Sequence, residues 1–194
     1  MASEKENIVR AFIAVEIPDV IKAAMREVQD GLRKSGADVG WVRPEGVHLT
    51  LKFLGPVEAG RIRGLAAALE RAVGGVKSFP LKAKGIGVFP SARAPRVVWL
   101  GLEGDMGALS ALYEGVEAAC EGIGFKREGR PFTPHLTLGR VKSPRGRDAL
   151  MRLVAEYDKV ELGDFTADFV SVMKSELRPS GAVYTEMARI VFKN

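Results

Sequence analysis

One tetrapeptide occurs twice in this chain, and its two copies contain every histidine of the protein. His-Leu-Thr-Leu stands at 48–51 and again at 135–138, and the 194 residues include only two histidines. From ordinary residue abundances, a second match after a given histidine is expected about once in a thousand. The repeat therefore constrains both the fold and the chemistry of the chain.

Each copy has the character of a β-strand that is entered from a turn. The tetrapeptide alternates, is rich in strand-forming residues and is preceded closely by a proline in both places. In a strand, residues i and i+2 project to the same face. We therefore expect His48 and Thr50 on one face of the first strand, and His135 and Thr137 on one face of the second. Two such strands that face each other would place two imidazoles and two hydroxyls around one cleft.

These four groups suit the hydrolysis of a phosphodiester. Imidazole titrates near pH 6.5, so one histidine can act as a general acid while the other acts as a general base. A threonine hydroxyl can donate a hydrogen bond to a non-bridging phosphate oxygen. A cyclic phosphate fits best, because water attacks on one side while a sugar oxygen leaves on the other. The structural alternative, two strand histidines satisfied in a core, is disfavoured by the identity of the two copies.

The rest of the chain predicts an α+β fold of two similar lobes related by a pseudo-two-fold axis. Each lobe is expected to be a small, mostly antiparallel sheet with helices outside and its His-x-Thr-x strand facing a central cleft. No Gly/Ser-rich or Pro-rich linker separates the halves, so 1–194 should form a single domain of two interleaved lobes. The hydrophobic pattern predicts helices at 20–35, 58–72, 106–121 and 147–157, and strands at 9–15, 41–42, 48–54, 79–89, 96–102, 135–138, 165–174 and 183–192.

Composition narrows the setting of the chain. Hydrophobic residues make up 46%, enough for a sizeable core, and the single cysteine, Cys120, excludes an internal disulfide and should be buried. The start of the chain is too charged for a signal sequence, and no stretch approaches a membrane span, so we expect a cytoplasmic protein without membrane contact. Neither a metal nor a cofactor is expected, because metal-ligand clusters and nucleotide-binding glycine motifs are absent from the sequence. No obligate protein partner is implied.

Positive charge collects around the second tetrapeptide. The net charge is +5, and residues 126–152 contain eight basic and two acidic side chains. A basic segment beside a candidate phosphate site favours RNA as the partner, although an ordinary solvated face would have the same composition.

Two segments of the sequence resemble the paired signatures of the 2H phosphoesterase superfamily. Residues 44–55 (PEGVHLTLKFLG) are similar to the first signature and residues 131–140 (PFTPHLTLGR) to the second. The branch most similar is that of the RNA 2′,3′-cyclic phosphodiesterases, also called 2′-5′ RNA ligases or LigT-like proteins. Weaker matches lie at 10–14, 87–90, 96–99 and 175–177, so the resemblance spans nearly the whole chain.

The resemblance implies an RNA-processing hydrolase that opens 2′,3′-cyclic phosphate ends, tRNA-like or other, to 2′-phosphate ends. It implies His48 as the proton donor and His135 as the proton acceptor, although the two copies are locally alike. Other activities of the same superfamily stay open: hydrolysis of an ADP-ribose cyclic phosphate, or ATP-independent 2′-5′ joining of RNA ends. A non-catalytic RNA-binding module that uses the same cleft is a further alternative.

Four further side chains are candidates for contact with the substrate. The resemblance gives Arg140 a contact with the phosphate or the base, but strict alternation places it opposite His135 unless Gly139 permits a bulge. Phe53 and Phe89 are candidates for stacking on a base, with a place in the core as the alternative for each, and the resemblance favours Phe53 for the stacking role. Lys52 continues the parity of His48 and is expected either in the cleft or as an edge lysine. Phe12 and Trp99 are expected to be structural, and Tyr184 is within reach of the cleft.

Overall fold

Two antiparallel sheets form the framework of the molecule. The computed structural model describes residues 8–179 and 181–193. The first sheet has the strand order β3-β1-β8-β9 and the second the order β2-β6-β5-β4-β7. The strands are β1 (Ile8–Glu16), β2 (Val39–Trp41), β3 (His48–Glu58), β4 (Phe79–Phe89), β5 (Val97–Gly104), β6 (Leu136–Val141), β7 (Glu161–Ala167), β8 (Phe169–Arg178) and β9 (Gly181–Val191).

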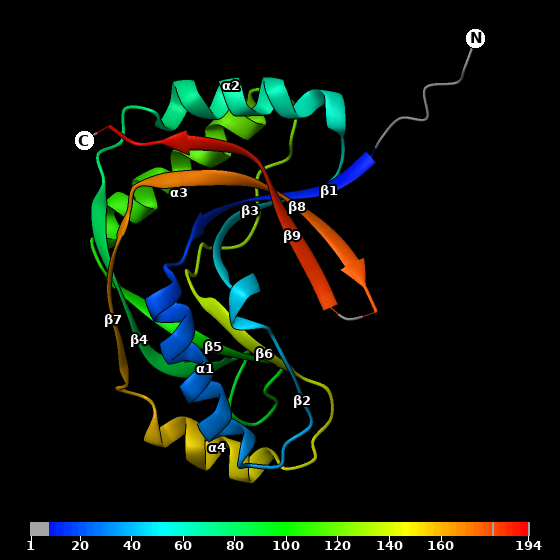
Figure 1. Cartoon of the computed structure of the whole chain (residues 1–194), viewed down its shortest axis with the longest axis vertical. Coiled ribbons are helices and arrows are strands. Elements are labelled where there is room, and N and C mark those ends of the chain that lie inside the picture. Colours follow the sequence, from blue (N-terminus) through cyan, green and yellow to red (C-terminus); the bar gives the residue numbers. More distant parts are fainter. Residues whose placement is uncertain (1–7, 180, 194) are drawn as a thin grey trace.

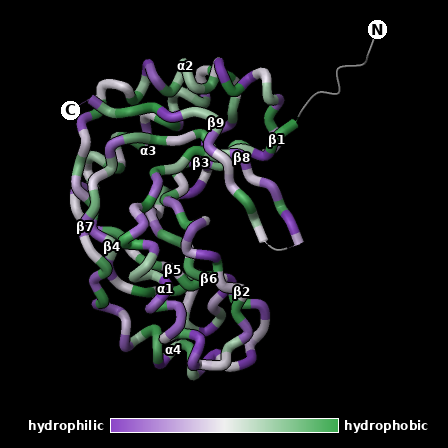
Figure 2. The backbone as a smooth tube through the Cα atoms, viewed as in Figure 1, coloured by the Kyte–Doolittle hydropathy of each residue, from purple (hydrophilic) through white to green (hydrophobic). Residues whose placement is uncertain are grey.

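Four helices cover the two sheets in pairs. They are α1 (Asp19–Arg33), α2 (Ile62–Val73), α3 (Met106–Glu121) and α4 (Arg147–Glu156), with short 3-10 turns at Pro44–Gly46 and Ala59–Arg61. Helices α2 and α3 pack together and contact β9 and β3, whereas α1 and α4 pack together and contact β7 and β4 (Figure 1). Hydrophobic and hydrophilic residues alternate along the surface helices (Figure 2), as expected for helices with one buried face.

The two lobes repeat one topology, and each exchanges a helix with the other. In the first lobe β3 pairs with β1, which pairs with β8 and then β9; in the second, β6 pairs with β5, then β4 and then β7. Helix α1 follows a strand of the first sheet but packs in the second lobe, and α3 follows a strand of the second sheet but packs in the first. The expected fold class, α+β with two pseudo-symmetric lobes, is thereby confirmed.

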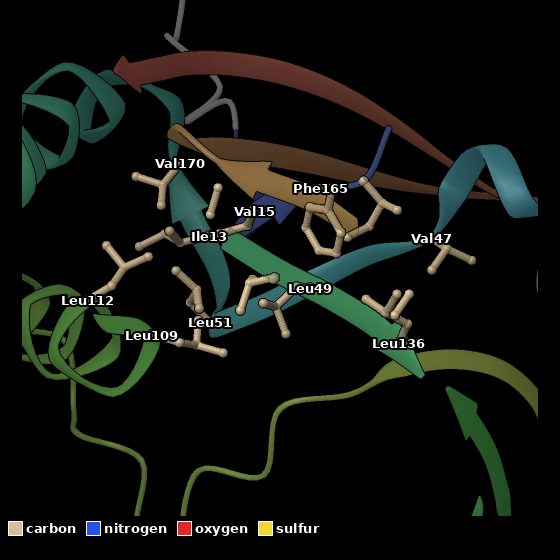
Figure 3. Packing of buried hydrophobic residues seen from close by; sticks show 14 of the residues in the cluster. Ile13, Val15, Val47, Leu49, Leu51, Leu109, Leu112, Leu136, Phe165 and Val170 are labelled. Carbon is tan, nitrogen blue, oxygen red and sulfur yellow. The ribbon is translucent and has the colours of Figure 1, made fainter. Parts of the chain in front are cut away.

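A single hydrophobic cluster runs through both lobes. It contains Ile13 of β1, Leu49 and Leu51 of β3, Leu136 of β6 and Leu112 of α3, all at most 4% exposed (Figure 3). Cys120 is buried in the same cluster, as expected, and burial raises the pKa of its thiol to about 11. The two lobes therefore share one hydrophobic core.

None of the helices in residues 8–179 and 181–193 has the length and hydrophobicity that a membrane-spanning helix needs.

Several expected strands differ by a few residues at their ends, and two differ most from those observed. The strand expected at 165–174 is two strands, because the chain leaves the second sheet after Ala167 and enters the first at Phe169. Strand β3 does not stop at Gly55; it continues to Glu58, because Gly55 adopts a positive φ of 71° while its pairing with β1 is kept. Both differences depend on the partner strands, which the local pattern does not reveal.

Candidate active site

Strands β3 and β6 belong to different sheets, yet they contact each other where the two lobes meet. Along β3, Leu49 and Leu51 are buried while His48 and Thr50 are half-buried. The second copy has the same alternation, with Leu136 and Leu138 buried and the histidine and threonine half-buried. The leucines of both copies enter the shared core, where Figure 3 shows Leu49, Leu51 and Leu136. The half-buried polar side chains alternate with them along the chain.

A β-bulge follows the threonine in each copy. Thr50 pairs with Ala14 and Lys52 with Ile13, so Leu51 is the extra residue of β3. In β6 the corresponding extra residue is Leu138. Thr137 pairs there with Trp99, and Gly139 pairs with Val98. Because a one-residue bulge reverses the side-chain alternation beyond it, the residues five positions after each histidine return to the histidine face.

The bulge places Lys52 away from the cleft, which corrects the expectation from strict alternation. Lys52 is 5% exposed, and its Nζ donates to both carboxylate oxygens of Glu117 on α3, at 2.8 and 2.9 Å. A third hydrogen bond of 2.9 Å goes to the carbonyl of Lys126. Lys52 is thus a buried, fully paired cation and does not reach a substrate in the cleft.

The same geometry brings Phe53 and Arg140 to the histidine faces. Phe53 is 72% exposed and its ring centroid lies 6.3 Å from that of Phe12, which itself stacks on His48. Arg140 is exposed and pairs with Val97, two residues before the partner of Thr137. The bulge that Gly139 was expected to permit is present. Within residues 8–179 and 181–193, the side chain of Arg140 makes no hydrogen bond or ion pair, so its guanidinium is available to a ligand.

His48 is enclosed by aromatic rings. Phe12 of β1 stacks on the imidazole with centroids 4.4 Å apart, and Tyr184 of β9 meets it edge-on at 4.9 Å. Burial among these rings lowers the pKa of His48 to about 4, and the nearby charge of Lys22 acts in the same direction. A hydrogen bond from a ring N–H to the carbonyl of Gly46 favours the charged form but does not outweigh the burial. His48 is therefore neutral at neutral pH in the free protein.

His135 is oriented by a bond of the same kind. Its Nδ1 lies 2.7 Å from the carbonyl oxygen of Thr133, two residues earlier, just as His48 bonds to Gly46. A carbonyl only accepts, so Nδ1 carries the hydrogen and Nε2 is the nitrogen left to exchange a proton. Phe89 meets the His135 ring edge-on, with centroids 5.1 Å apart. Each histidine thus has an orienting carbonyl at position i−2 and an aromatic neighbour.

Sequence reasoning missed part of this aromatic surrounding. Phe12 was expected to be structural, but its stacked ring helps to set the polarity around His48. Tyr184 was expected within reach of the cleft, and its contact with His48 makes it part of the site. Phe12 lies two positions before Ala14, the partner of Thr50, and only the strand register reveals that relation.

The threonine hydroxyls are available for a ligand. Among the described residues, neither Thr50 nor Thr137 forms a hydrogen bond with another side chain or with the backbone through its hydroxyl. No group of three or more His, Cys, Asp or Glu side chains within 8–179 and 181–193 is placed to hold a metal ion. The groups on the histidine faces of β3 and β6, two imidazoles, two hydroxyls and a guanidinium, suit an anion.

The basic segment at 126–152 is not one continuous patch. Arg127 pairs with Glu114 and Glu121, and Arg147 pairs with Asp148, so part of the charge is neutralised. A groove of about 340 Å³ lies elsewhere, between α1 and the segment that leads into β3, and two of its three arginines are also paired, Arg26 with Glu45 and Arg33 with Asp30. It is lined by Arg26, Gln29, Asp30, Arg33, Trp41, Val42, Arg43, Pro44 and Glu45.

The two strands that carry the repeated His-x-Thr pairs, β3 and β6, belong to different sheets and contact each other, an arrangement that fits a phosphoesterase with paired histidines. The family profile described as LigT like Phosphoesterase matches residues 15–99 and 101–184. The RNA 2′,3′-cyclic phosphodiesterase of Methanothermobacter thermautotrophicus is 40% identical over 179 residues, 92% of this chain and 96% of that protein. The protein of the same name from Thermotoga maritima is 35% identical, covering 95% of this chain and 96% of that one.

Solved structures share the fold of this chain. The Thermus thermophilus protein TT0787 superposes with a TM-score of 0.78 at 30% identity, over 94% of this chain and 97% of that one. E. coli LigT in complex with 3′-AMP superposes with a TM-score of 0.76 at 23% identity, over 97% of this chain and 100% of that one, which supports the fold. The chain therefore belongs to the LigT-like phosphoesterase (2H) family, an enzyme family. The resemblance inferred from the two signatures is confirmed.

Proposed function

We propose that the protein hydrolyses the 2′,3′-cyclic phosphate ends of RNA to 2′-phosphate ends by acid–base catalysis, without a metal ion. The observation that carries this proposal is the pairing of two His-x-Thr strands, each with an orienting carbonyl, at the contact of β3 with β6. The naming of the relatives as RNA 2′,3′-cyclic phosphodiesterases supports the choice of substrate.

The cyclic phosphate is held by neutral donors and one cation. The hydroxyls of Thr50 and Thr137 donate to the two non-bridging oxygens from opposite lobes, and Arg140 adds a charged donor from the His135 face. Phe53, exposed beside Phe12, offers its ring to the terminal base. Because each lobe supplies one threonine hydroxyl, the phosphate is bound by residues from both lobes, at the pseudo-two-fold axis.

Two proton transfers complete the reaction. Nε2 of His135 removes a proton from water as the water oxygen bonds to phosphorus, and the P–O3′ bond breaks in line with the attack. His48 gives its proton to the departing O3′, so the phosphate stays on O2′. Afterwards His135 is protonated and His48 neutral; His135 then loses its proton to solvent, and His48 takes one up when the next substrate enters.

The low pKa of His48 has a consequence for this sequence of steps. His48 is neutral in the free protein at neutral pH, so it must gain its proton when the substrate enters. The anionic phosphate favours the imidazolium, because an opposite charge within a few ångströms stabilises the charged form. The substrate therefore brings about the protonation of its own acid.

The groove beside β3 favours RNA over a small nucleotide. Arg43 lies five residues before His48, and the guanidinium of Arg33, which also pairs with Asp30, lies 5.6 Å from the ring of Trp41, so the groove combines cations with an aromatic surface. Such a combination suits a single strand, whose phosphates and bases alternate. An ADP-ribose cyclic phosphate would not extend along it, and RNA 2′-5′ ligation would use the same surface in the reverse reaction.

Hydrolysis of a short RNA with a 2′,3′-cyclic phosphate end, in the presence of EDTA, tests the proposal. We expect turnover to a 2′-phosphate end in the native protein and a loss of at least about 10³-fold for His48→Ala and for His135→Ala, with unchanged thermal unfolding. Near-normal hydrolysis by His135→Ala would refute the mechanism. Binding of the RNA without turnover, unaffected by either change, would instead indicate a non-catalytic RNA-binding module.

A further inference from the structure

A buried ion pair connects the His48 strand to the segment that leads into the His135 strand. The side chains of Lys52 and Glu117 are buried almost completely, at 4% and 1% exposure, and bond through two contacts of 2.8 and 2.9 Å. Lys52 also donates to the carbonyl of Lys126 at 2.9 Å, and Glu117 accepts from the backbone N–H of Glu128 at 3.1 Å. We call these four contacts the Lys52–Glu117 bridge.

Helix α3 holds the same segment at a second point. Tyr113 stands one turn before Glu117, so both side chains lie on one face of the helix. The Tyr113 ring stacks on Phe132 with centroids 4.1 Å apart and planes within 6°. Phe132 is followed at once by Thr133, whose carbonyl orients His135. The segment that orients His135 therefore packs against α3 and is hydrogen-bonded to Lys52 of the strand that contains His48.

The other lobe contains a matching arrangement. Gln29 on α1 is 1% exposed, and its Nε2 donates to the carbonyls of Leu138 and Val42, at 2.8 Å each. Leu138 is the bulge residue of the His135 strand, and Val42 lies in the segment that leads into His48. We call these two contacts the Gln29 bridge. Each exchanged helix thus carries one buried polar side chain that joins the motif strand of one lobe to the approach of the other histidine.

Burial of these groups is not explained by stability alone. A buried ion pair gains little over apolar residues of similar volume, because desolvation offsets the attraction. Gln29 bears a similar cost, since its buried Oε1 has no hydrogen-bond partner among the described residues. Such groups fix the relative orientation of the segments that they join, because their hydrogen bonds are satisfied in one arrangement only. Both bridges lie where a small rotation would move an imidazole relative to the phosphate.

We propose that Lys52, Glu117 and Gln29 are positioning residues that fix the two catalytic histidines relative to each other across the lobes. The Lys52–Glu117 bridge sets the approach to His135, and the Gln29 bridge sets the approach to His48. This inference rests on the proposed function for its effect on turnover, but its effect on the geometry of the histidines can be measured without any substrate.

The test compares Lys52→Met/Glu117→Leu with Gln29→Leu. Both variants keep the side-chain volume and remove the polar contacts without leaving a buried charge unpaired. Their melting temperatures should therefore lie within a few degrees of that of the native protein. We expect kcat on the cyclic-phosphate RNA to fall about 10- to 100-fold in each, since misplacement of about 1 Å costs that much, with KM changed less than about threefold. Glu117→Gln is the contrasting variant: it leaves the buried ammonium of Lys52 without a counter-charge, so it should lower the melting temperature, unlike the double variant.

The histidine signals decide between positioning and general loosening. With only two histidines, the Cε1–H resonances are resolved and assigned through His48→Asn and His135→Asn. The double variant should shift the His135 resonance and spare that of His48, and Gln29→Leu should do the reverse. Native kcat with both resonances unmoved would overturn the inference, as would equal shifts of both in each variant. If the double variant does not fold, Gln29→Leu alone decides: a lower kcat with a shifted His48 resonance and an unmoved His135 resonance supports the inference, and native kcat with both resonances unmoved overturns it. An inactive native protein would refute the proposed function and leave the resonance test standing.

Discussion

The protonation of His48 should depend on the aromatic cage around it. At a pKa of about 4, only about one molecule in a thousand carries a protonated His48 at pH 7, against about one in four for a free imidazole. Replacing Tyr184 by Ala removes the ring that lies edge-on at 4.9 Å and admits water to the imidazole. Because desolvation is the main cause of the low pKa, the titration midpoint of His48 should rise from about pH 4 to about pH 5.

The assay is a proton–carbon NMR titration of the His48 Cε1–H. Phe89→Ala is the matched control, because it removes a half-buried aromatic neighbour from His135 and should leave the His48 midpoint unchanged. Addition of a nucleoside 2′-phosphate, the expected product, should raise the His48 midpoint in the native protein, since the phosphate favours the charged ring. A His48 midpoint at or above about pH 6.5, the value of a free imidazole, in the free native protein would refute the desolvation argument, and so would an unchanged midpoint in Tyr184→Ala.

The same pKa difference predicts how stability depends on pH. The pKa of His48 is lower in the folded protein than in the unfolded chain, so the unfolded chain binds more protons between about pH 6.5 and pH 4. The free energy of unfolding should therefore fall as the pH falls through that window, by at most about 3 kcal/mol from this residue. Tyr184→Ala should flatten the slope, which urea unfolding at a series of pH values would measure; an equal slope in His48→Asn would contradict the assignment to this residue.

Three further predictions concern the substrate. Thr50→Val and Thr137→Val should each lower kcat about 10- to 100-fold with the fold intact, because each removes one hydrogen-bond donor to the phosphate. Steady-state kinetics and thermal unfolding measure the two effects, and a lower melting temperature with native kcat would indicate a merely structural role. Arg140→Lys should not restore the activity lost in Arg140→Ala, because one ammonium does not replace a forked donor. Arg43→Ala should raise KM for an RNA of several nucleotides and leave KM for a mononucleotide 2′,3′-cyclic phosphate unchanged, and an equal effect on both substrates would remove the groove from the RNA path.

The sequence predicted the site as far as its own periodicity reached. The duplicated tetrapeptide was sufficient to pair His48 with Thr50 and to separate both from the leucines, because the alternation of a strand is a local property. Beyond Leu51 the strict alternation no longer predicted the side-chain directions correctly. The bulge at Leu51 arises from the register with β1, and it moves Lys52 from the expected cleft face into a buried contact with Glu117, 65 positions along the chain.

Contacts between distant segments account for the other differences. Nothing near Phe12 marks it as a neighbour of His48, since the stacking depends on the pairing of β1 with β3. The division of the expected strand at 165–174 depends on two different sheets competing for the residues on either side of Asp168. The expected bulge before Arg140 was correct because Gly139 provided a local signal; the equivalent bulge before Phe53 has a lysine at that position and provided none.

The exchange of helices α1 and α3 has a consequence for the integrity of the molecule. A break in the loop at 90–96 would yield two fragments, each with strands from both sheets and one His-x-Thr pair. Neither fragment could close a lobe alone, because each half of the chain lends its helix to the sheet that the other half completes. The two halves should therefore depend on each other as the subunits of an obligate heterodimer do. Separated halves should stay unfolded, and only their mixture should regain structure and turnover.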